Sequence, residues 1–263
     1  MLIGFSRFLA SAAASALNSF GYTRRSVPFF FIFTFSFCCI PRLSFCLPEW
    51  VKSKAHILAL SGGFSTGDEP DGSGKFIANV LHAPAVSGAV NGLLEKQGLI
   101  LGICNGFQAL IKLGLVPYGS YCAVDSNMPT LTFNRIGRHV SRMVRTKVMS
   151  VNSPWLSLEE PGAIHVIPIS HGEGRLVIRH DEGAALFKNG QVPFCYAGAD
   201  GLPAAHEPDN PNGSDFAIEG LTSPDGRILG KMGHSERRGE YVHINIPGNK
   251  RQNIFEAGIK YFA

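Results

Sequence analysis

What the sequence has little of already narrows its class. Charged residues make up 17% of the 263-residue chain and form no lysine- and arginine-rich block, so nothing indicates a nucleic-acid partner. Six cysteines are too few for a small disulfide scaffold. The sequence contains no CxxC or HExxH motif and its nine histidines are scattered, so we expect no metal site.

The composition that is present fits a globular protein. Hydrophobic residues make up 45% of the chain, which excludes disorder over its whole length. The length suffices for one large α/β domain or two small ones with a substantial core. The net charge of +4 is too small to identify a partner, and 30 glycines predict many tight turns.

The first fifty residues differ from the rest. They hold 10 of the 19 phenylalanines, and the apolar run 27–40 is only 14 residues long. A membrane-spanning helix needs about 20, so we expect no membrane partner. Three interpretations stay open: a secretory signal, an organelle transit peptide, or a non-native extension from a misassigned start. We therefore divide the chain into an atypical apolar segment, 1–50, and a domain, 51–263.

The body begins with alternating strands and helices. Strands are predicted at 55–60 and 98–104, and helices at 75–96, with a break near Pro84, and at 105–115. The repeated order of strand, sharp turn and helix predicts a three-layer α/β sandwich around a mostly parallel sheet, as in flavodoxin-like folds.

The second half is richer in strands. It ends with a predicted hairpin, formed by 217–221 and 227–232 around a Ser-Pro-Asp-Gly turn, and with a closing helix at 253–262. Further strand patterns precede the hairpin, at 131–134, 139–151, 164–170 and 175–180.

A candidate nucleophile lies where the second predicted strand meets its helix. Cys104 is flanked by Gly102 and Gly106, which is the layout of a nucleophile elbow with cysteine in place of serine. The positive end of the helix dipole favours the reactive thiolate. A buried structural cysteine is the competing interpretation, and the strand–helix context favours the nucleophile.

A candidate base and its orienting group follow 130 residues later. In an extended segment, His234 and Glu236 point to the same side, so Glu236 can fix the imidazole tautomer while His234 faces the sulfur. The alternative is a solvated histidine beside a surface glutamate. Donors for an oxyanion are predicted at the Gly62-Gly63 turn and at the backbone N–H of Asn105, although Gly62-Gly63 also fits a plain tight turn.

Two glycine-containing runs complete the candidates. His171-Gly172-Glu173-Gly174-Arg175 stands at a predicted strand end and suits the binding of an amino-acid head group. The run Asn210-Pro211-Asn212-Gly213-Ser214 is a strong turn signal, for which a surface turn and a functional role are equally good interpretations.

At these residues a resemblance becomes close. The segments SGGFSTGDE, LGICNGFQALIKLGLVPYG, ISHGEGRL, NPNGSDFAIEGLTSPDGRILGKMGHSER and IFEAGIKYF resemble the glutaminase part of phosphoribosylformylglycinamidine synthase, a class I (triad) glutamine amidotransferase domain. The resemblance covers about residues 55–263. The cysteine elbow and the His-x-Glu step are common to the class, whereas GGFSxGD, HGEGR and NPNGS point to the purine enzyme.

The resemblance implies a division of labour. The glutaminase would hydrolyse glutamine through a cysteinyl thioester, and a synthetase partner would use ATP and magnesium to turn formylglycinamide ribonucleotide into its amidine. Cys104 would be the nucleophile, His234 the base and Glu236 its orienter, with Gly63 and Asn105 donating to the oxyanion. No cofactor is implied for this chain. Positions near the substrate glutamine would be Gln108, Asn134, His171 and Glu173.

The sequence departs from the family at two places. The triad segment commonly reads PHPER, and here it reads GHSER, so both prolines are missing while the triad residues remain. The family domain also begins with a strand, a helix and a second strand, and the Phe-rich segment stands in their place. A missing central strand would leave an open sheet edge, which puts folding and activity in question.

Other functions stay open from the sequence. The chain could be an amidotransferase or cysteine hydrolase of another pathway, or a truncated, catalytically impaired fragment that docks on a synthetase. The body holds three cysteines, one of them the candidate thiolate, which fits a reducing cytoplasm, with organelle targeting by the N-terminal segment as the alternative.

Overall fold

A computed structural model of the chain describes residues 29–33, 55–63, 72–123 and 125–263, with the backbone alone for 29–33. Most of the apolar segment 1–50 and the glycine-rich loop 64–71 lie outside the described residues. The interpretations of the N-terminal segment as a signal, a transit peptide or an extension are therefore not addressed by the structure.

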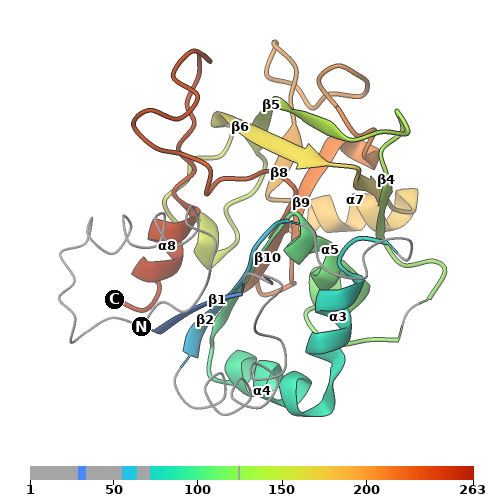
Figure 1. The fold of residues 1–263 in the computed structure, drawn as a ribbon, viewed down its shortest axis with the longest axis vertical. Helices are drawn as coiled ribbons and strands as arrows, with labels where there is room; N and C mark the ends of the chain where they lie inside the picture. Colours follow the sequence, from blue (N-terminus) through green and yellow to red (C-terminus); the bar gives the residue numbers. More distant parts are fainter. Residues whose placement is uncertain (1–28, 34–54, 64–71, 124) are drawn as a thin grey trace.

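The core of the molecule is one eight-stranded sheet in the order β1-β2-β3-β10-β9-β8-β5-β6 (Figure 1). The first four strands in this order run parallel, and the others are antiparallel to their neighbours. The parallel strands are β1 (Phe29–Phe33), β2 (Ala55–Leu60), β3 (Leu99–Ile103) and β10 (Ile228–Lys231). The antiparallel part consists of β9 (Ile218–Thr222), β8 (Phe194–Tyr196), β5 (Val140–Val148) and β6 (Ile164–His171). A separate two-stranded sheet pairs β4 (Thr130–Phe133) with β7 (Glu173–Val177).

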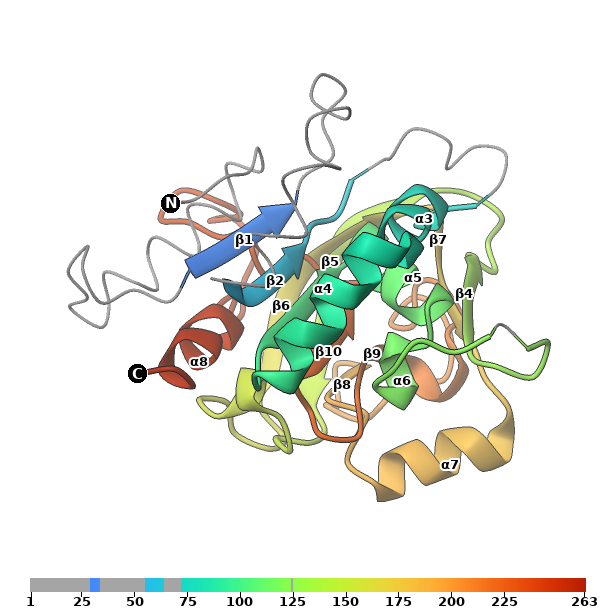
Figure 2. The same ribbon diagram turned by 90° about the horizontal axis from the view of Figure 1, so that it is seen from below.

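Helices cover both faces of the parallel strands, which confirms the predicted α/β fold. On one side lie α3 (Lys75–His82), α4 (Pro84–Glu95), α5 (Asn105–Lys112) and the short α6 (Leu115–Tyr118). On the other side α8 (Ile254–Lys260) packs against the 3₁₀ turn Pro154–Leu156 (Figure 2). Every residue of β3 is buried, as expected for a central strand covered on both faces. The predicted helix break occurs between α3 and α4, where Pro84 begins the second helix.

Several elements were not predicted, among them α7 (His180–Lys188) and β8. Helix α7 begins where strand character was expected at 175–180, and β7 ends at Val177. Only Gly183 and Leu186 of α7 are buried, so the helix carries almost no apolar stripe that a sequence pattern could reveal. Strand β8 has three residues and is too short to show a period.

The Phe-rich segment contributes a strand to the sheet. Residues 29–33 form β1, which pairs in parallel with β2, with Phe30 opposite Ile57 and Phe33 opposite Leu60. The outer edge of β2, which the missing family unit was expected to leave open, is therefore paired. Although β1 precedes residue 50, it belongs to the same sheet as the domain that follows.

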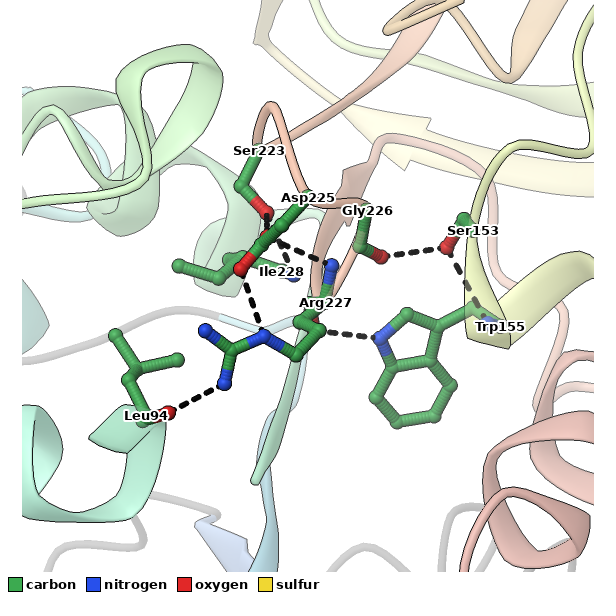
Figure 3. Close-up of polar contacts among 8 residues, drawn as sticks. All are labelled: Leu94, Ser153, Trp155, Ser223, Asp225, Gly226, Arg227 and Ile228. Atoms are coloured by element: carbon green, nitrogen blue, oxygen red, sulfur yellow. Dashed lines mark hydrogen bonds and ion pairs between the residues drawn. The ribbon is translucent and has the colours of Figure 1, made fainter. Parts of the chain in front are cut away.

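Hydrogen bonds join the turn of the C-terminal hairpin to α4 and to the 3₁₀ turn Pro154–Leu156 (Figure 3). Asp225 accepts hydrogen bonds from the Ser223 hydroxyl at 2.6 Å and from the Arg227 guanidinium at 2.7 Å. The Arg227 side chain also donates to the Leu94 carbonyl at the end of α4, and the Trp155 indole donates to the Arg227 carbonyl at 3.0 Å. These contacts fix the start of β10, the strand that leads into His234.

No single helix of the described residues is long and apolar enough to cross a membrane; α3 and α4 pass a test of length and composition only as a pair, bent by 83°.

Candidate active site

The nucleophile elbow is present in the structure. Cys104 directly follows β3 and precedes α5, with φ 52° and ψ −106°, a left-handed conformation that is rare and strained outside glycine. Its amide N–H donates to the Lys231 carbonyl on β10 at 2.8 Å, which joins the elbow to the neighbouring strand. The side chain is buried at the end of the sheet, and the sulfur lies 3.8 Å from the Ser170 carbonyl at the end of β6.

The positions of the two glycines around Cys104 leave no room for a side chain. A Cβ at Gly106 would lie 2.3 Å from the Leu60 carbonyl oxygen, and one at Gly102 would lie 2.5 Å from Leu110. Either side chain would push α5 away from the sheet. These two glycines therefore allow the strand and the helix to approach closely at the elbow.

His234 and Glu236 form the predicted step. The Nδ1 atom of His234 lies 2.6 Å from Oε1 of Glu236, and both side chains are buried. The His234 N–H donates to the Pro168 carbonyl of β6 at 2.9 Å. The predicted hydrogen bond is therefore present, but the predicted extended segment is not: the Arg237 N–H donates to the His234 carbonyl at 3.2 Å, so the two residues meet across a turn.

The charges in this pair stabilise each other. Burial alone would lower the pKa of His234, but the Glu236 carboxylate and the Cys104 sulfur outweigh it and raise the pKa to about 9. Burial would likewise raise the pKa of Glu236, but the adjacent imidazolium holds it below its usual value. The site therefore favours an imidazolium on His234 beside the Glu236 carboxylate at neutral pH.

The side chains of Cys104 and His234 lie side by side next to Gly62. A Cβ built on Gly62 would lie 2.6 Å from Cε1 of His234 and 2.9 Å from Cβ of Cys104, so both side chains pack on this glycine. Among the described residues, Nε2 of His234 has no hydrogen-bond partner and is available to the sulfur or to a substrate. The structure thus brings together all three predicted triad residues.

The predicted oxyanion donors lie around the same point. Gly62 and Gly63 follow β2 after Ser61, and Asn105 begins α5. Gly63 has φ 127°, and no atom of the described residues lies within 4 Å of a Cβ at this position. Because the first N–H groups of a helix have no acceptor within the helix, that of Asn105 is suited to an anion. The donor roles of Gly63 and Asn105 remain predictions.

Gln108 and Glu173 contact each other. The Gln108 side-chain amide, on the buried face of α5, donates to the Glu173 carbonyl. The Glu173 carboxylate accepts from the Ser73 N–H at 3.2 Å. These contacts join α5, β7 and the segment before α3, and the expected contacts with glutamine remain predictions.

Asn134 and His171 also bind each other. Oδ1 of Asn134 accepts from the Gly174 N–H and lies 3.1 Å from Nδ1 of His171, while its amide donates to the His171 carbonyl at 2.8 Å. Burial, with smaller contributions from His234 and His139, lowers the pKa of His171 to about 3. The ring is therefore neutral with its proton on Nδ1. A direct role of either residue at the substrate remains a prediction.

The Asn210–Ser214 run is not a surface turn. Asn210, Asn212 and Ser214 are buried, and the Asn212 amide donates to the Gly174 carbonyl at 2.7 Å and to the Tyr196 hydroxyl at 3.0 Å. The run lies between β8 and β9 in the chain, and the hydrogen bonds of Asn212 join it to β7 and β8, so its polar residues serve the packing.

Sequence reasoning missed a buried ion pair behind the triad. Nζ of Lys231 lies 3.1 Å from Oε1 of Glu219, and both side chains are fully buried. The only sequence signal was a lysine and a glutamate inside two otherwise apolar hairpin strands. No group of three or more potential metal ligands occurs among the described residues.

Comparison with known proteins gives the class first. Residues 49–262 match the family described as CobB/CobQ-like glutamine amidotransferase domain. That range covers most of the chain and includes the elbow and the His234–Glu236 step. The chain belongs to this family of glutamine amidotransferases.

Relatives narrow the class further. Phosphoribosylformylglycinamidine synthase subunit PurQ of Thermomicrobium roseum is 38% identical over 185 residues, which cover 70% of this chain and 71% of the relative. The subunit of the same name from Gloeobacter violaceus is 34% identical over 201 residues, covering 76% and 78%. Within its family the chain is thus a glutaminase component of phosphoribosylformylglycinamidine synthase, an enzyme of purine biosynthesis.

Solved structures agree with the fold. The structure of PurLQS from Thermotoga maritima matches with a TM-score of 0.59 and 27% identity, over 80% of this chain and 82% of that one. The glutaminase domain of Trypanosoma brucei CTPS, solved with bound acivicin, matches with a TM-score of 0.55 over 96% of this chain and 87% of that one. At 11% identity the second match shows the fold alone.

Proposed function

We propose that this chain hydrolyses glutamine at Cys104 and passes the ammonia to a synthetase that converts formylglycinamide ribonucleotide to its amidine. The observation that carries the proposal is the meeting, beside Gly62, of a strained cysteine and the buried His234–Glu236 pair. A strained backbone at such a point is typical of a nucleophile held for attack.

The first half of the reaction forms a thioester. The Cys104 thiolate attacks the side-chain carboxamide carbon of glutamine, and the carbonyl oxygen becomes an oxyanion that the N–H groups of Gly63 and Asn105 stabilise. The C–N bond then breaks while the His234 imidazolium gives its proton to the departing nitrogen. Ammonia leaves, and a glutamyl thioester remains on Cys104.

The second half of the reaction hydrolyses the thioester and regenerates the free enzyme. The now neutral His234 takes a proton from a water molecule, whose oxygen attacks the thioester carbon. The C–S bond breaks, releasing glutamate and restoring the thiolate, and His234 is again protonated. Glu236, bonded to Nδ1, keeps Nε2 directed at the reacting atoms in both halves and stabilises the imidazolium.

A synthetase partner completes the assignment. The relatives are named as subunits, and the Thermotoga maritima structure is named as an assembly. Glutamine hydrolysis by a cysteine needs no ATP, so we assign ATP and magnesium to the synthetase and no cofactor to this chain. We place the pair in the cytoplasm because Cys104, Cys122 and Cys195 are free thiols, as a reducing compartment maintains them.

The decisive experiment is labelling with an electrophilic glutamine analogue, read by mass spectrometry. We expect one label, on Cys104, that excess glutamine suppresses. The half-buried Cys122 is the internal control, since its pKa is raised by burial and it should stay unlabelled. Equal labelling of Cys104 and Cys122, or none at Cys104, would mean that the pocket does not form and would favour a docking role.

A second arm tests the reaction itself. Cys104→Ala should abolish glutamine hydrolysis. Thermal unfolding of this variant, followed by circular dichroism, should remain cooperative. Hydrolysis that persists in this variant would overturn the proposal. Addition of the synthetase and formylglycinamide ribonucleotide should yield the amidine from glutamine, whereas transfer only to another acceptor would place the chain in another pathway.

A further inference from the structure

The segment that carries His234 and Glu236 has no regular structure of its own. It lies after β10 outside any strand or helix, and neither Gly233 nor Ser235 supplies the rigid backbone of a proline. The 2.6 Å contact between His234 and Glu236 must therefore be held by contacts from the rest of the molecule.

The upstream end is held by the buried ion pair. The Gly233 N–H donates to Oε1 of Glu219 at 2.5 Å, and Nζ of Lys231 donates to the Gly233 carbonyl at 2.8 Å. Both backbone groups of Gly233 are thus bonded. A Cβ at this position would lie 2.2 Å from Ile167, so the packing also requires glycine.

The downstream part is held by Gln252, which lies two residues before the start of α8. The Ser235 hydroxyl donates to Oε1 of Gln252, and Nε2 of Gln252 donates to the Thr146 hydroxyl on β5 at 3.1 Å. All three side chains are buried. Since Ser235 stands between the two triad residues, this chain of bonds ties the centre of the step to the sheet.

Gln252 also receives the end of the segment. The Arg238 guanidinium donates to the Gln252 carbonyl at 3.1 Å and to the Glu256 carboxylate at 2.7 Å. One residue therefore binds the triad segment at two points, through its side chain to Ser235 and through its backbone to Arg238.

We propose that Gln252 is a positioning residue for the glutaminase reaction, which through Ser235 and Thr146 holds His234 and Glu236 in the orientation that faces Cys104. The Gln252 side chain touches no reacting atom and contacts the triad segment through Ser235. The inference rests on the proposed triad and adds to it the group that sets its geometry.

The test uses the full chain in four forms: wild type, Gln252→Ala, Ser235→Ala and the double variant. The matched control is Gln191→Ala, because Gln191 is also a buried glutamine whose side-chain amide donates two hydrogen bonds, to the Pro117 and Thr222 carbonyls, while its oxygen accepts from Asn189. Both Gln variants should lose similar stability in urea. We expect Gln252→Ala alone to lower kcat for glutamine hydrolysis by about tenfold or more, with KM nearly unchanged.

The double variant tests the route. If Gln252 acts through Ser235, the losses in kcat of the two single variants should not add, and the double variant should resemble Gln252→Ala. Ser235→Thr, which keeps the hydroxyl, should retain most of the activity. Additive losses, or a kcat of Gln252→Ala equal to that of Gln191→Ala, would overturn the proposal.

A spectroscopic readout separates this proposal from the proposed function. The proton between Nδ1 of His234 and Glu236 should give a strongly downfield proton resonance in wild type and in Gln191→Ala, absent from His234→Asn. Loss or upfield movement of that signal in Gln252→Ala supports positioning even if the chain hydrolyses no glutamine. An unchanged signal in Gln252→Ala contradicts positioning even if hydrolysis is confirmed.

Discussion

At the scale of single residues, the site depends on space as much as on chemistry. Cys104 and His234 follow two strands that are far apart in the sequence, and both side chains pack on Gly62, which has no side chain of its own. From the sequence, a tight turn and an oxyanion donor were expected there. The sequence could not show that a methyl group at this position would stand between nucleophile and base.

A Gly62→Ala substitution should therefore inactivate the enzyme while leaving it folded. The new methyl would lie 2.6 Å from the His234 ring and 2.9 Å from Cβ of Cys104, so one of the two side chains must move. Since a displacement of about 1 Å can cost about 100-fold in rate, we expect kcat to fall by at least that factor.

The control for this substitution is Gly88→Ala on the exposed face of α4, where no atom lies within 4 Å of the added carbon. It should leave kcat unchanged and stabilise the protein by about 0.5–1 kcal/mol, since alanine is the better helix former. Steady-state kinetics and urea unfolding of both variants measure this. Full activity of Gly62→Ala would show that the two side chains do not meet as described.

At the scale of elements, β10 organises the site. Its last residue, Lys231, accepts the Cys104 N–H through its carbonyl and binds the Gly233 carbonyl through its ammonium, so one residue contacts both the elbow and the triad segment. Glu219 on the antiparallel neighbour β9 neutralises that ammonium inside the protein. The hairpin thus pairs two buried charges with each other, because the surrounding apolar residues cannot solvate them.

Lys231→Met should destabilise the protein by about 3–5 kcal/mol, because it leaves the Glu219 carboxylate buried without its partner. The double variant Lys231→Met with Glu219→Leu should recover much of that loss, since both charges are then gone. Urea unfolding at pH 7 measures the three free energies. As a control, Arg179→Ala breaks the exposed Arg179–Asp181 pair and should leave the free energy of unfolding almost unchanged. If Lys231→Met alone and the double variant lost the same free energy of unfolding, the unpaired Glu219 carboxylate would not be the cause of the loss.

Elements with a strong local signal were predictable and those fixed by tertiary contacts were not. The apolar strands β2 and β3, the elbow and the hairpin were predicted because burial on both faces and turn residues leave clear patterns. Helix α7 and strand β8 were missed because one buries almost nothing and the other is too short. The roles of Lys231 and Gln252 depend on partners 12 and 106 residues away, which no local pattern records.

At the scale of the whole molecule, buried histidines set the dependence of stability on pH. Burial lowers the pKa of His165 to about 4 and that of His171 to about 3, so both stay neutral in the fold while the unfolded chain protonates them below about pH 6.5. Stability should therefore fall as the pH drops below about 6.5. His234 has the opposite sign, since its pKa in the fold is raised to about 9.

Above about pH 6.5, the dependence of stability on pH is set by His234 of the triad. A group whose pKa is raised by folding contributes fully below its unfolded pKa of about 6.5, and the contribution is lost as the pH rises through about 9. A shift of that size corresponds to about 3 kcal/mol. In His234→Asn the titrating group is gone, so the difference in unfolding free energy between wild type and variant should shrink by about that amount from pH 6.5 to 9, measured by urea unfolding at each pH. A difference that stays constant over this range would mean that the imidazolium is not stabilised between Glu236 and Cys104, and the proton that the proposed mechanism gives to ammonia would then have to come from elsewhere.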